Sequence, residues 1–182
     1  MTNPREPGIS VRRIRADEWQ AVRRLRLEST ADPDAAIAFL ERPHEVAERG
    51  DDFWRDRAEK AAGSDVAAQY VAVVDEEWVG SLSVLVRATG DRDHLGRIVD
   101  DRRAFVVGVY VRPVNRGTGA VDLLLAAAAE WAATQGLDRV FLDVHRDNLR
   151  AQGAYRRAGF EPTGETLTGP IGPEIVMARP VP

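Results

Sequence analysis

The chain reads Val109-Tyr-Val-Arg-Pro-Val-Asn-Arg-Gly-Thr-Gly-Ala-Val121 at the point where an apolar strand is followed by a long helix. Gly117 and Gly119 allow the backbone of the connecting turn to approach a ligand closely. The first turn of the helix leaves N–H groups without intrahelical partners, and the helix dipole favours negative charge there. The segment therefore predicts one of two structures: a cradle for a diphosphate, or an ordinary strand-to-helix turn that uses glycine for positive φ angles.

Two common phosphate-binding loops do not fit this segment. It lacks the Lys-Ser/Thr ending of a P-loop, which disfavours hydrolysis of nucleoside triphosphates. It also lacks a Gly-X-Gly-X-X-Gly pattern, and the strands before it look antiparallel, whereas a dinucleotide fold opens with a βαβ unit. A different phosphate ligand is expected.

Hydrophobic periodicity predicts strands and helices on both sides of this segment. The expected strands are residues 10–15, 70–74, 78–86, 104–111, 139–144, 160–167 and 175–178. One expected helix starts near residue 17. The others cover residues 34–62, 117–135 and 148–158, and Pro43 is expected to break the first of these three. Residues 75–77 suit a hairpin turn, and residues 87–103 are expected to be a solvated connection. This order predicts the α/β class, of the α+β type, with a central mixed, mostly antiparallel sheet flanked by helices.

Length and composition limit the class of protein. The chain has 182 residues, of which 44% are hydrophobic and 30% charged. A single domain is therefore expected over residues 9–182, behind a flexible N-terminal tail at residues 1–8. There is no cysteine, which excludes disulfides, thiolate metal sites and a cysteine nucleophile. No metal site is predicted, because His44, His94 and His145 sit in unrelated segments.

Charge and hydropathy set expectations for partners and location. The formal net charge is −4, so the chain gives no electrostatic footprint for DNA or RNA, and no nucleic-acid partner is expected. The start of the chain has no apolar leader, and the longest apolar run, residues 123–129, is too short for a membrane span. A cytoplasmic location without membrane contact is therefore predicted.

A second block of sequence strengthens the indication from the glycine segment. It reads Leu142-Asp-Val-His-Arg-Asp-Asn148, then Ala151, then Ala154-Tyr155-Arg-Arg-Ala-Gly159-Phe160. Together with Arg116-Gly117-Thr118-Gly119-Ala120-Val121, it resembles the GNAT (GCN5-related N-acetyltransferase) family, whose central motif is Arg/Gln-X-X-Gly-X-Gly/Ala. Val121 stands where the family usually has Gly or Ala. The resemblance covers most of residues 9–178 and is specific from about residue 104 to residue 160.

The resemblance implies a GNAT domain that transfers an acetyl group from acetyl-CoA to a primary amine by direct attack. Backbone groups of Val109 and Val111 are then expected to pair with the pantetheine arm, with one bulged N–H facing the thioester oxygen. The pyrophosphate and the arm are expected at Arg116, Gly117, Thr118, Gly119, Ala120, Val121 and Asn148. Asn148 also suits the N-cap of the helix that follows it.

The resemblance also implies a proton donor. Tyr155 matches the general acid of the family, and a phenol of pKa about 10 can protonate a thiolate of pKa about 8.5 only if it is held close to it. A core tyrosine is the alternative for this residue. The general base is not visible, because residues 106–110 lack the glutamate that many members carry on this strand. The remaining candidates are Glu28, Glu77, Asp101, Asp143 and His145.

Acceptor and assembly stay open at the level of sequence. A small-molecule or peptide amine is the expected acceptor, and nothing local selects among them. The alternative is an acyl-CoA sensor or degenerate module without catalysis, favoured by Val121 and the missing strand glutamate. Action on charged tRNA is disfavoured by the acidic net charge, although a basic face around Arg23, Arg24 and Arg26 would revive it. A homodimer through the terminal strand, residues 175–178, is one hypothesis.

Overall fold

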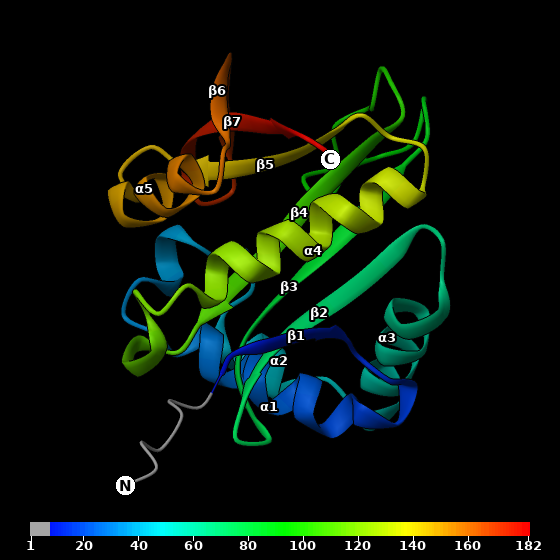
Figure 1. Ribbon diagram of the computed structural model, residues 1–182, viewed down its shortest axis with the longest axis vertical. Helices are drawn as coiled ribbons and strands as arrows, with labels where there is room; N and C mark the ends of the chain where they lie inside the picture. Colours follow the sequence, from blue (N-terminus) through cyan, green and yellow to red (C-terminus); the bar gives the residue numbers. More distant parts are fainter. Residues whose placement is uncertain (1–7) are drawn as a thin grey trace, which may run out of the picture.

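The computed structural model describes residues 8–182, so the predicted tail, residues 1–8, lies outside the described part except for Gly8. Within that part, seven strands form one sheet in the order β1-β2-β3-β4-β5-β7-β6 (Figure 1). In chain order they are β1 Ser10–Arg13, β2 Ala67–Val74, β3 Glu77–Arg87, β4 Arg103–Val111, β5 Arg139–His145, β6 Glu161–Gly169 and β7 Gly172–Pro180. The α-helices are α1 Trp19–Thr30, α2 Pro43–Glu48, α3 Asp51–Gly63, α4 Ala120–Thr134 and α5 Leu149–Arg157.

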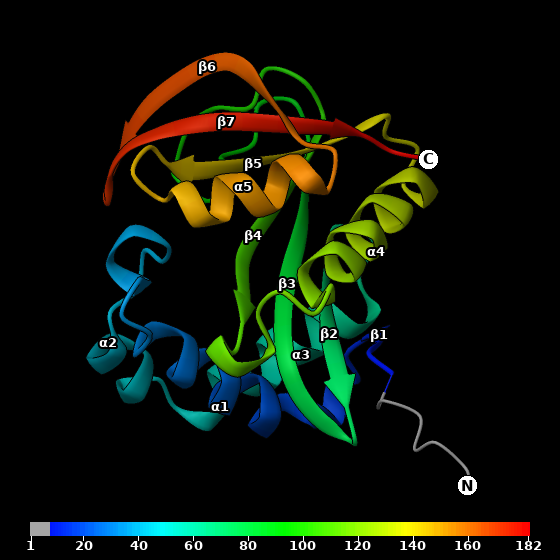
Figure 2. The ribbon, with the colours of Figure 1, turned by 60° about the vertical axis from the view of Figure 1, so that its left-hand side comes forward.

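Strand pairing divides the sheet into two groups. Strands β1 to β4 pair antiparallel in chain order, and β5, β7 and β6 form a second antiparallel group. The groups meet where β4 and β5 pair in parallel, Ala104 with Val140 and Phe105 with Phe141. From there the two strands diverge, and Figure 2 shows β5 and β7 turned steeply away from the upright β4. The predicted mixed, mostly antiparallel sheet is confirmed.

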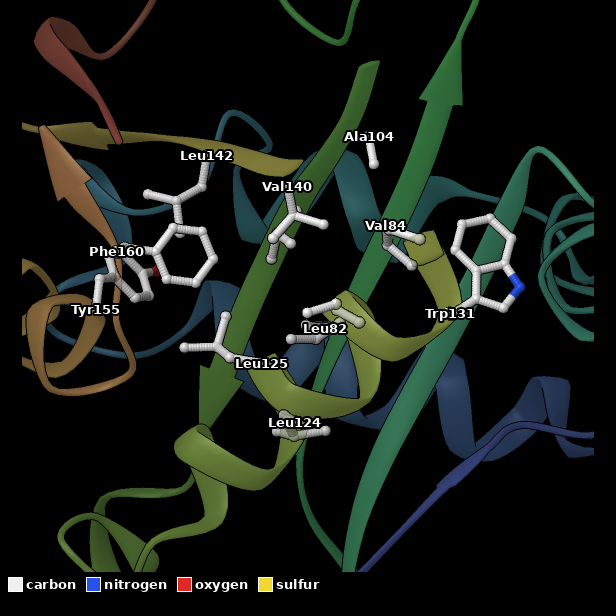
Figure 3. Close-up of a cluster of buried hydrophobic side chains, with 14 of the residues drawn as sticks. Leu82, Val84, Ala104, Leu124, Leu125, Trp131, Val140, Leu142, Tyr155 and Phe160 are labelled. Carbon is white, nitrogen blue, oxygen red and sulfur yellow. The ribbon is translucent and has the colours of Figure 1, made fainter. Parts of the chain in front are cut away.

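Helices cover both faces of the first group of strands. Helix α4 lies across one face, and α1 and α3 pack on the other (Figure 1). Leu124, Leu125 and Trp131 of α4 share the larger apolar cluster with Leu82 and Val84 of β3 (Figure 3). A second cluster joins α1, α2 and α3 to β2. Burial on both faces explains why β4 is almost continuously apolar.

Helix α4 and strand β3 begin at other residues than predicted, and backbone angles explain both differences. Helix α4 begins at Ala120 instead of residue 117, since Gly117 and Gly119 have φ angles of 79° and 89°, outside the helical range. The hairpin turn contains Asp75 and Glu76, with φ angles of 47° and 67°, as a type I′ turn requires. Strand β3 therefore begins earlier than predicted.

Two further expectations do not fit the structure. Residues 87–103 are not simply solvated, because Asp93 and Val99 are 8% and 4% exposed and an ion pair ties this loop to β5. Residues 175–178 are not a free edge for dimerisation, because β7 pairs with β5 on one side and with β6 on the other. The free edges of the sheet are β1 and β6.

Candidate active site

A cleft of about 850 Å³ lies where β4 and β5 separate. Its walls come from β4, β5 and α5, from the glycine turn (residues 116–121), from α3 and from residues 32–41. The glycine turn lies at one end, and buried polar side chains of β5 and β7 line another part of the wall. A ligand in this volume can therefore reach the backbone of β4 and buried ionisable groups at the same time.

Strand β4 carries a β-bulge within the cleft. The register of β3 and β4 shifts between the pairs Ser81–Tyr110 and Ser83–Val107, so two residues of β4 lie opposite one residue of β3. Gly108 is one of the two and has a φ angle of 63°, in the left-handed region that favours glycine. The bulge releases backbone groups of β4 from the strand ladder on the side of the cleft wall.

Seven of the nine predicted cofactor-binding residues line the cleft, whereas Thr118 and Gly119 of the glycine turn are not among its lining residues. Val109, Val111, Arg116, Gly117, Ala120, Val121 and Asn148 line the cleft. A Cβ added at Gly117 or Gly119 would meet no atom within 4 Å. Among the described residues, no backbone carbonyl accepts the N–H of Gly117, Thr118 or Gly119. Open space, unused N–H groups and the N-terminus of α4 fit the diphosphate of coenzyme A.

Side chains of the glycine turn hold it in place. The guanidinium of Arg116 pairs with Asp32 at 2.5 Å and donates through Nε to the carbonyl of Val111 at 3.1 Å. The hydroxyl of Thr118 donates to the carbonyl of Asn115 at 2.7 Å. These contacts fix the conformation of the turn, so that its N–H groups are arranged before a ligand arrives.

Helix α5 presents the polar residues of the second sequence block. Asn148 caps it by accepting the N–H of Ala151 at 3.1 Å, which confirms the expected N-cap. Tyr155 lines the cleft, is 9% exposed and packs its ring 6.1 Å from the ring of Phe160. Burial raises the pKa of Tyr155 to about 12, although the charge of Arg150 opposes this rise. The phenol is therefore protonated at physiological pH.

Three of the five candidate bases lie outside the cleft wall. Glu28 and Glu77 are ion-paired with Arg112, at 2.8 Å and 3.3 Å. Asp101 is exposed and lies beside Arg103. Because none of these carboxylates lines the cleft, a proton acceptor has to come from other residues.

Asp143 and His145 do line the cleft, from the face of β5 opposite α4. Asp143 is held by Arg97 at 2.7 Å and faces His94 at 3.3 Å. The Nδ1 of His145 accepts the N–H of Asp147 at 3.1 Å, so the neutral ring carries its proton on Nε2. The carboxylate is thus engaged in an ion pair and the imidazole presents a donor, which makes both poor proton acceptors.

Glu174 is a cleft carboxyl that the sequence analysis missed. It lies on β7 opposite His145 in the β5–β7 register and is 5% exposed. Its Oε1 has no hydrogen-bond partner among the described residues. Burial, and then the charge of Asp143, raise the pKa of Glu174, while His94, Arg97 and His145 act in the opposite direction. A raised pKa and a place in the cleft wall suit a general base.

A bulged strand, a glycine turn with unused N–H groups and a buried tyrosine around one cleft define a site for acyl transfer from an acyl-CoA. Residues 40–160 match the acetyltransferase (GNAT) family, and the chain belongs to that family. It is an N-acetyltransferase that uses acetyl-CoA as its co-substrate and transfers the acetyl group to an amine.

Relatives match the chain over most of its length. The chain is 27% identical over 133 residues to an aminoglycoside N(6')-acetyltransferase type 1 of Stenotrophomonas maltophilia, across 73% of this chain and 84% of the relative. It is 27% identical over 158 residues to the L-amino acid N-acetyltransferase AaaT of Escherichia coli (strain K12), across 86% and 85%. The solved structure of the PaiA N-acetyltransferase of Thermoplasma acidophilum in complex with coenzyme A matches with a TM-score of 0.73 and 17% identity, over 95% of this chain and 99% of that one.

Three other possibilities find no support within residues 8–182. No cluster of three or more His, Asp or Glu side chains there could hold a metal ion. No helix in the same range combines the length and apolarity that a membrane crossing needs. Arg23 and Arg26 of α1 pair with Asp51 at 3.6 Å and Glu41 at 2.7 Å. Two of the three arginines that an RNA-binding face would use are therefore already neutralised.

Proposed function

We propose that the acceptor is the primary amine of a small molecule or a peptide, and that it meets the acetyl group inside the cleft. The cleft itself supports this proposal, because it joins the glycine turn to Tyr155 and Glu174 in one continuous volume. Such a volume holds both substrates together, which favours direct transfer. The absence of cysteine is consistent with a route that has no acyl-cysteine intermediate.

The cofactor residues divide into two groups. Backbone N–H groups of the glycine turn, from Gly117 to Val121, bind the pyrophosphate, with Arg116 and Thr118 fixing their arrangement. Val109 and Val111 offer backbone groups to the pantetheine arm, and Asn148 lies in the same wall. Acetyl-CoA supplies the acetyl group as an activated thioester. A backbone N–H released by the bulge of β4 is then the donor that polarises the acetyl carbonyl.

Proton transfer needs an acceptor on the amine side and a donor on the sulfur side. Glu174 takes the proton of the amine, and Tyr155 gives its hydroxyl proton to the departing sulfur. The pKa of Tyr155, about 12, exceeds that of a free thiol, about 8.5, so complete transfer costs roughly 5 kcal/mol on these values. Burial of the sulfur beside the phenol raises the pKa of the thiol too and narrows this gap.

Calorimetric titration with acetyl-CoA tests the cofactor site, and release of free thiol after addition of amines tests the transfer. Saturable binding together with amine-dependent thiol release supports the proposed function. Binding without thiol release across a broad set of primary amines would contradict it. Failure of acetyl-CoA to bind would contradict the assignment of the glycine turn as well.

Glu174→Gln is expected to lower kcat/KM by about 10²- to 10⁴-fold, because an amide cannot accept the proton of the amine. The same change is expected to raise Tm at pH 7. The pKa of Glu174 is raised above its ordinary value of 4.5, so the stability of the fold falls as the pH rises from 4.5 through the folded pKa. Glutamine removes this cost of a buried charge. Thiol release and thermal unfolding measure the two effects.

Glu165→Gln is the matched control, since Glu165 is exposed on β6 and should affect neither activity nor Tm. In the wild type, kcat/KM should fall on acidification at a pH above the ordinary pKa of a glutamate, because the pKa of Glu174 is raised. Wild-type activity in Glu174→Gln would eliminate Glu174 as the proton acceptor.

We further infer one catalytic domain over residues 9–182 and a cytoplasmic location, both supported by the sequence. A homodimer built by strand addition would use β1 or β6, which are the free edges of the sheet. Light scattering of the purified protein distinguishes a monomer from such a dimer.

A further inference from the structure

The α3 side of the cleft brings together Arg26, Arg49 and Arg57. Glu41 pairs with Arg26 at 2.7 Å and with Arg49 at 2.6 Å. One carboxylate therefore serves two of the three guanidinium groups. No ion pair within residues 8–182 includes Arg57. This part of the wall carries an excess of positive charge.

Two other arginines of the cleft are neutralised, whereas Arg87 and Lys60, which also line it, form no ion pair among the described residues. Arg116 pairs with Asp32 at 2.5 Å, and Arg150 pairs with Asp34 at 2.6 Å. Both lie near the glycine turn and α5, where the coenzyme is expected. Arg57 comes instead from α3, on the opposite side of the sheet from α4. Its unpaired charge therefore faces the part of the cleft that remains for the acceptor.

Neutral polar groups surround Arg57 and add to the same niche. Gln69 and Ser83 are 5% and 9% exposed, and the Oε1 of Gln69 has no hydrogen-bond partner within the described residues. The pKa of Arg57 is lowered by burial and by repulsion from Arg26, which the attraction of Glu41 does not fully offset. A half-buried cation in this situation gains from an arriving anion.

The niche lies beside the bulge of β4. Arg57, Gln69, Ser83 and Gly108 together line a small side cavity of about 20 Å³. That volume is about the space of one water molecule, so Arg57 and the bulge border the same small space. A Cβ built on Gly108 would also lie 3.6 Å from an Nη of Arg26. The positive charge is therefore close to the backbone assigned to the thioester.

We propose that this niche is a carboxylate subsite and that the acceptor is an α-amino acid. Arg57 binds the carboxylate, with hydrogen bonds from the hydroxyl of Ser83 and the amide of Gln69, and the amine points to the acetyl group at the bulge. In an α-amino acid, the amine and the carboxylate share one carbon atom, so a carboxylate bound at Arg57 keeps the amine near Gly108, which lines the same side cavity. The proposal rests on the function proposed above.

Charge at the two ends of the cleft agrees with a zwitterionic acceptor. The carboxylate of Glu174 and the paired Asp143 lie on the β5–β7 side, where the amine has to lose its proton. A polycationic amine would place a second cation against Arg26, Arg49 and Arg57, where repulsion opposes it. Polyamines and amino sugars are therefore expected to be poor acceptors.

Paired acceptors isolate the carboxylate. Thiol release is measured with the standard L-amino acids, with the α-carboxamide of every amino acid tested, and with spermidine as a polycation. Each pair shares its side chain and differs at the carboxylate. The amide is the more reactive nucleophile at neutral pH because its amine has the lower pKa. We expect kcat/KM to favour the amino acid by at least about tenfold despite this.

Arg57→Met keeps much of the side-chain length and removes the charge. The variant is expected to lower the acid-to-amide ratio, which is kcat/KM for an amino acid divided by kcat/KM for its α-carboxamide, toward one. The change should lie mainly in KM, and the Kd for acetyl-CoA should stay unchanged. Arg57→Lys should restore part of the preference. Arg55→Met is the matched control, because Arg55 lies on the same helix, is exposed and does not line the cleft. Calorimetry with the preferred amino acid, on protein saturated with CoA, should show the same loss of affinity without turnover.

Several outcomes overturn the inference while the proposed function stands. One is transfer to amides or to spermidine as efficient as transfer to amino acids, and another is an unchanged acid-to-amide ratio in Arg57→Met. Transfer to amines without any transfer to amino acids is a third. Failure of acetyl-CoA to bind the wild type would instead remove the proposed function, and the inference with it.

Discussion

Gly119→Glu is expected to weaken acetyl-CoA binding by at least about 100-fold, which corresponds to about 2.7 kcal/mol. The residue has a φ angle of 89°, and a side chain there enters the open space in front of α4. Glutamate adds a negative charge where the pyrophosphate is expected, which opposes binding. The left-handed backbone also lowers the free energy of unfolding by roughly 1–2 kcal/mol for an L-residue. Calorimetric titration measures the loss.

Gly90→Glu is the matched control for this change. Gly90 has a φ angle of 87°, its added Cβ also meets no atom within 4 Å, and it lies in the loop between β3 and β4 instead of the glycine turn. The two variants should therefore lose similar stability, whereas acetyl-CoA binding should be lost in Gly119→Glu alone. Retained binding in a folded Gly119→Glu protein would contradict the placement of the pyrophosphate at the glycine turn.

Tyr155→Phe is expected to lower kcat by about 10²- to 10³-fold while the Kd for acetyl-CoA changes little, because the hydroxyl acts on the departing sulfur. With a pKa of about 12, Tyr155 stays protonated well above pH 9. The wild type should therefore show no alkaline loss of kcat from this group below about pH 11. Thiol release across a pH series, with calorimetry at pH 7.5, separates chemistry from binding.

Tyr70→Phe serves as the control, since Tyr70 lies on β2, packs against the main cluster and does not line the cleft. It should keep wild-type kcat. A fall in kcat for Tyr155→Phe that is matched by Tyr70→Phe would point to a general loss of packing. Unchanged kcat in Tyr155→Phe would mean that water or another donor protonates the sulfur.

Local features of the chain made part of the site predictable. Gly117 and Gly119 mark the turn because few other residues adopt φ angles near 80° to 90°, and the apolar spacing after them marks α4. Asn148 was recognisable as an N-cap because its role depends on a residue three positions away. Each of these signals is complete within one turn or helix, so the sequence alone contains it.

Glu174 and Arg57 could not be recognised in this way, because their roles depend on distant partners. Glu174 becomes a buried cleft residue through pairing with His145, and Gly and Pro around it suggested a turn. Its position two residues before apolar Val176, on the same face of a strand, was a usable signal. Arg57 sits on a charged helix and becomes distinctive only beside Gln69, where no carboxylate meets it. The buried loop around Asp93 was missed for the same reason.

The brief contact between β4 and β5 has a thermodynamic consequence. The two halves of the sheet share backbone bonds along a very short seam, around Ala104 and Phe105, and are otherwise connected through α4 and side-chain packing. An extended pantetheine chain seated between the strands would bridge both halves, so occupancy by the co-substrate is coupled to the rigidity of the sheet. The folded population of this protein would then rise with the concentration of acetyl-CoA around it, which makes acetyl-CoA supply a determinant of how long the protein survives as well as how fast it works.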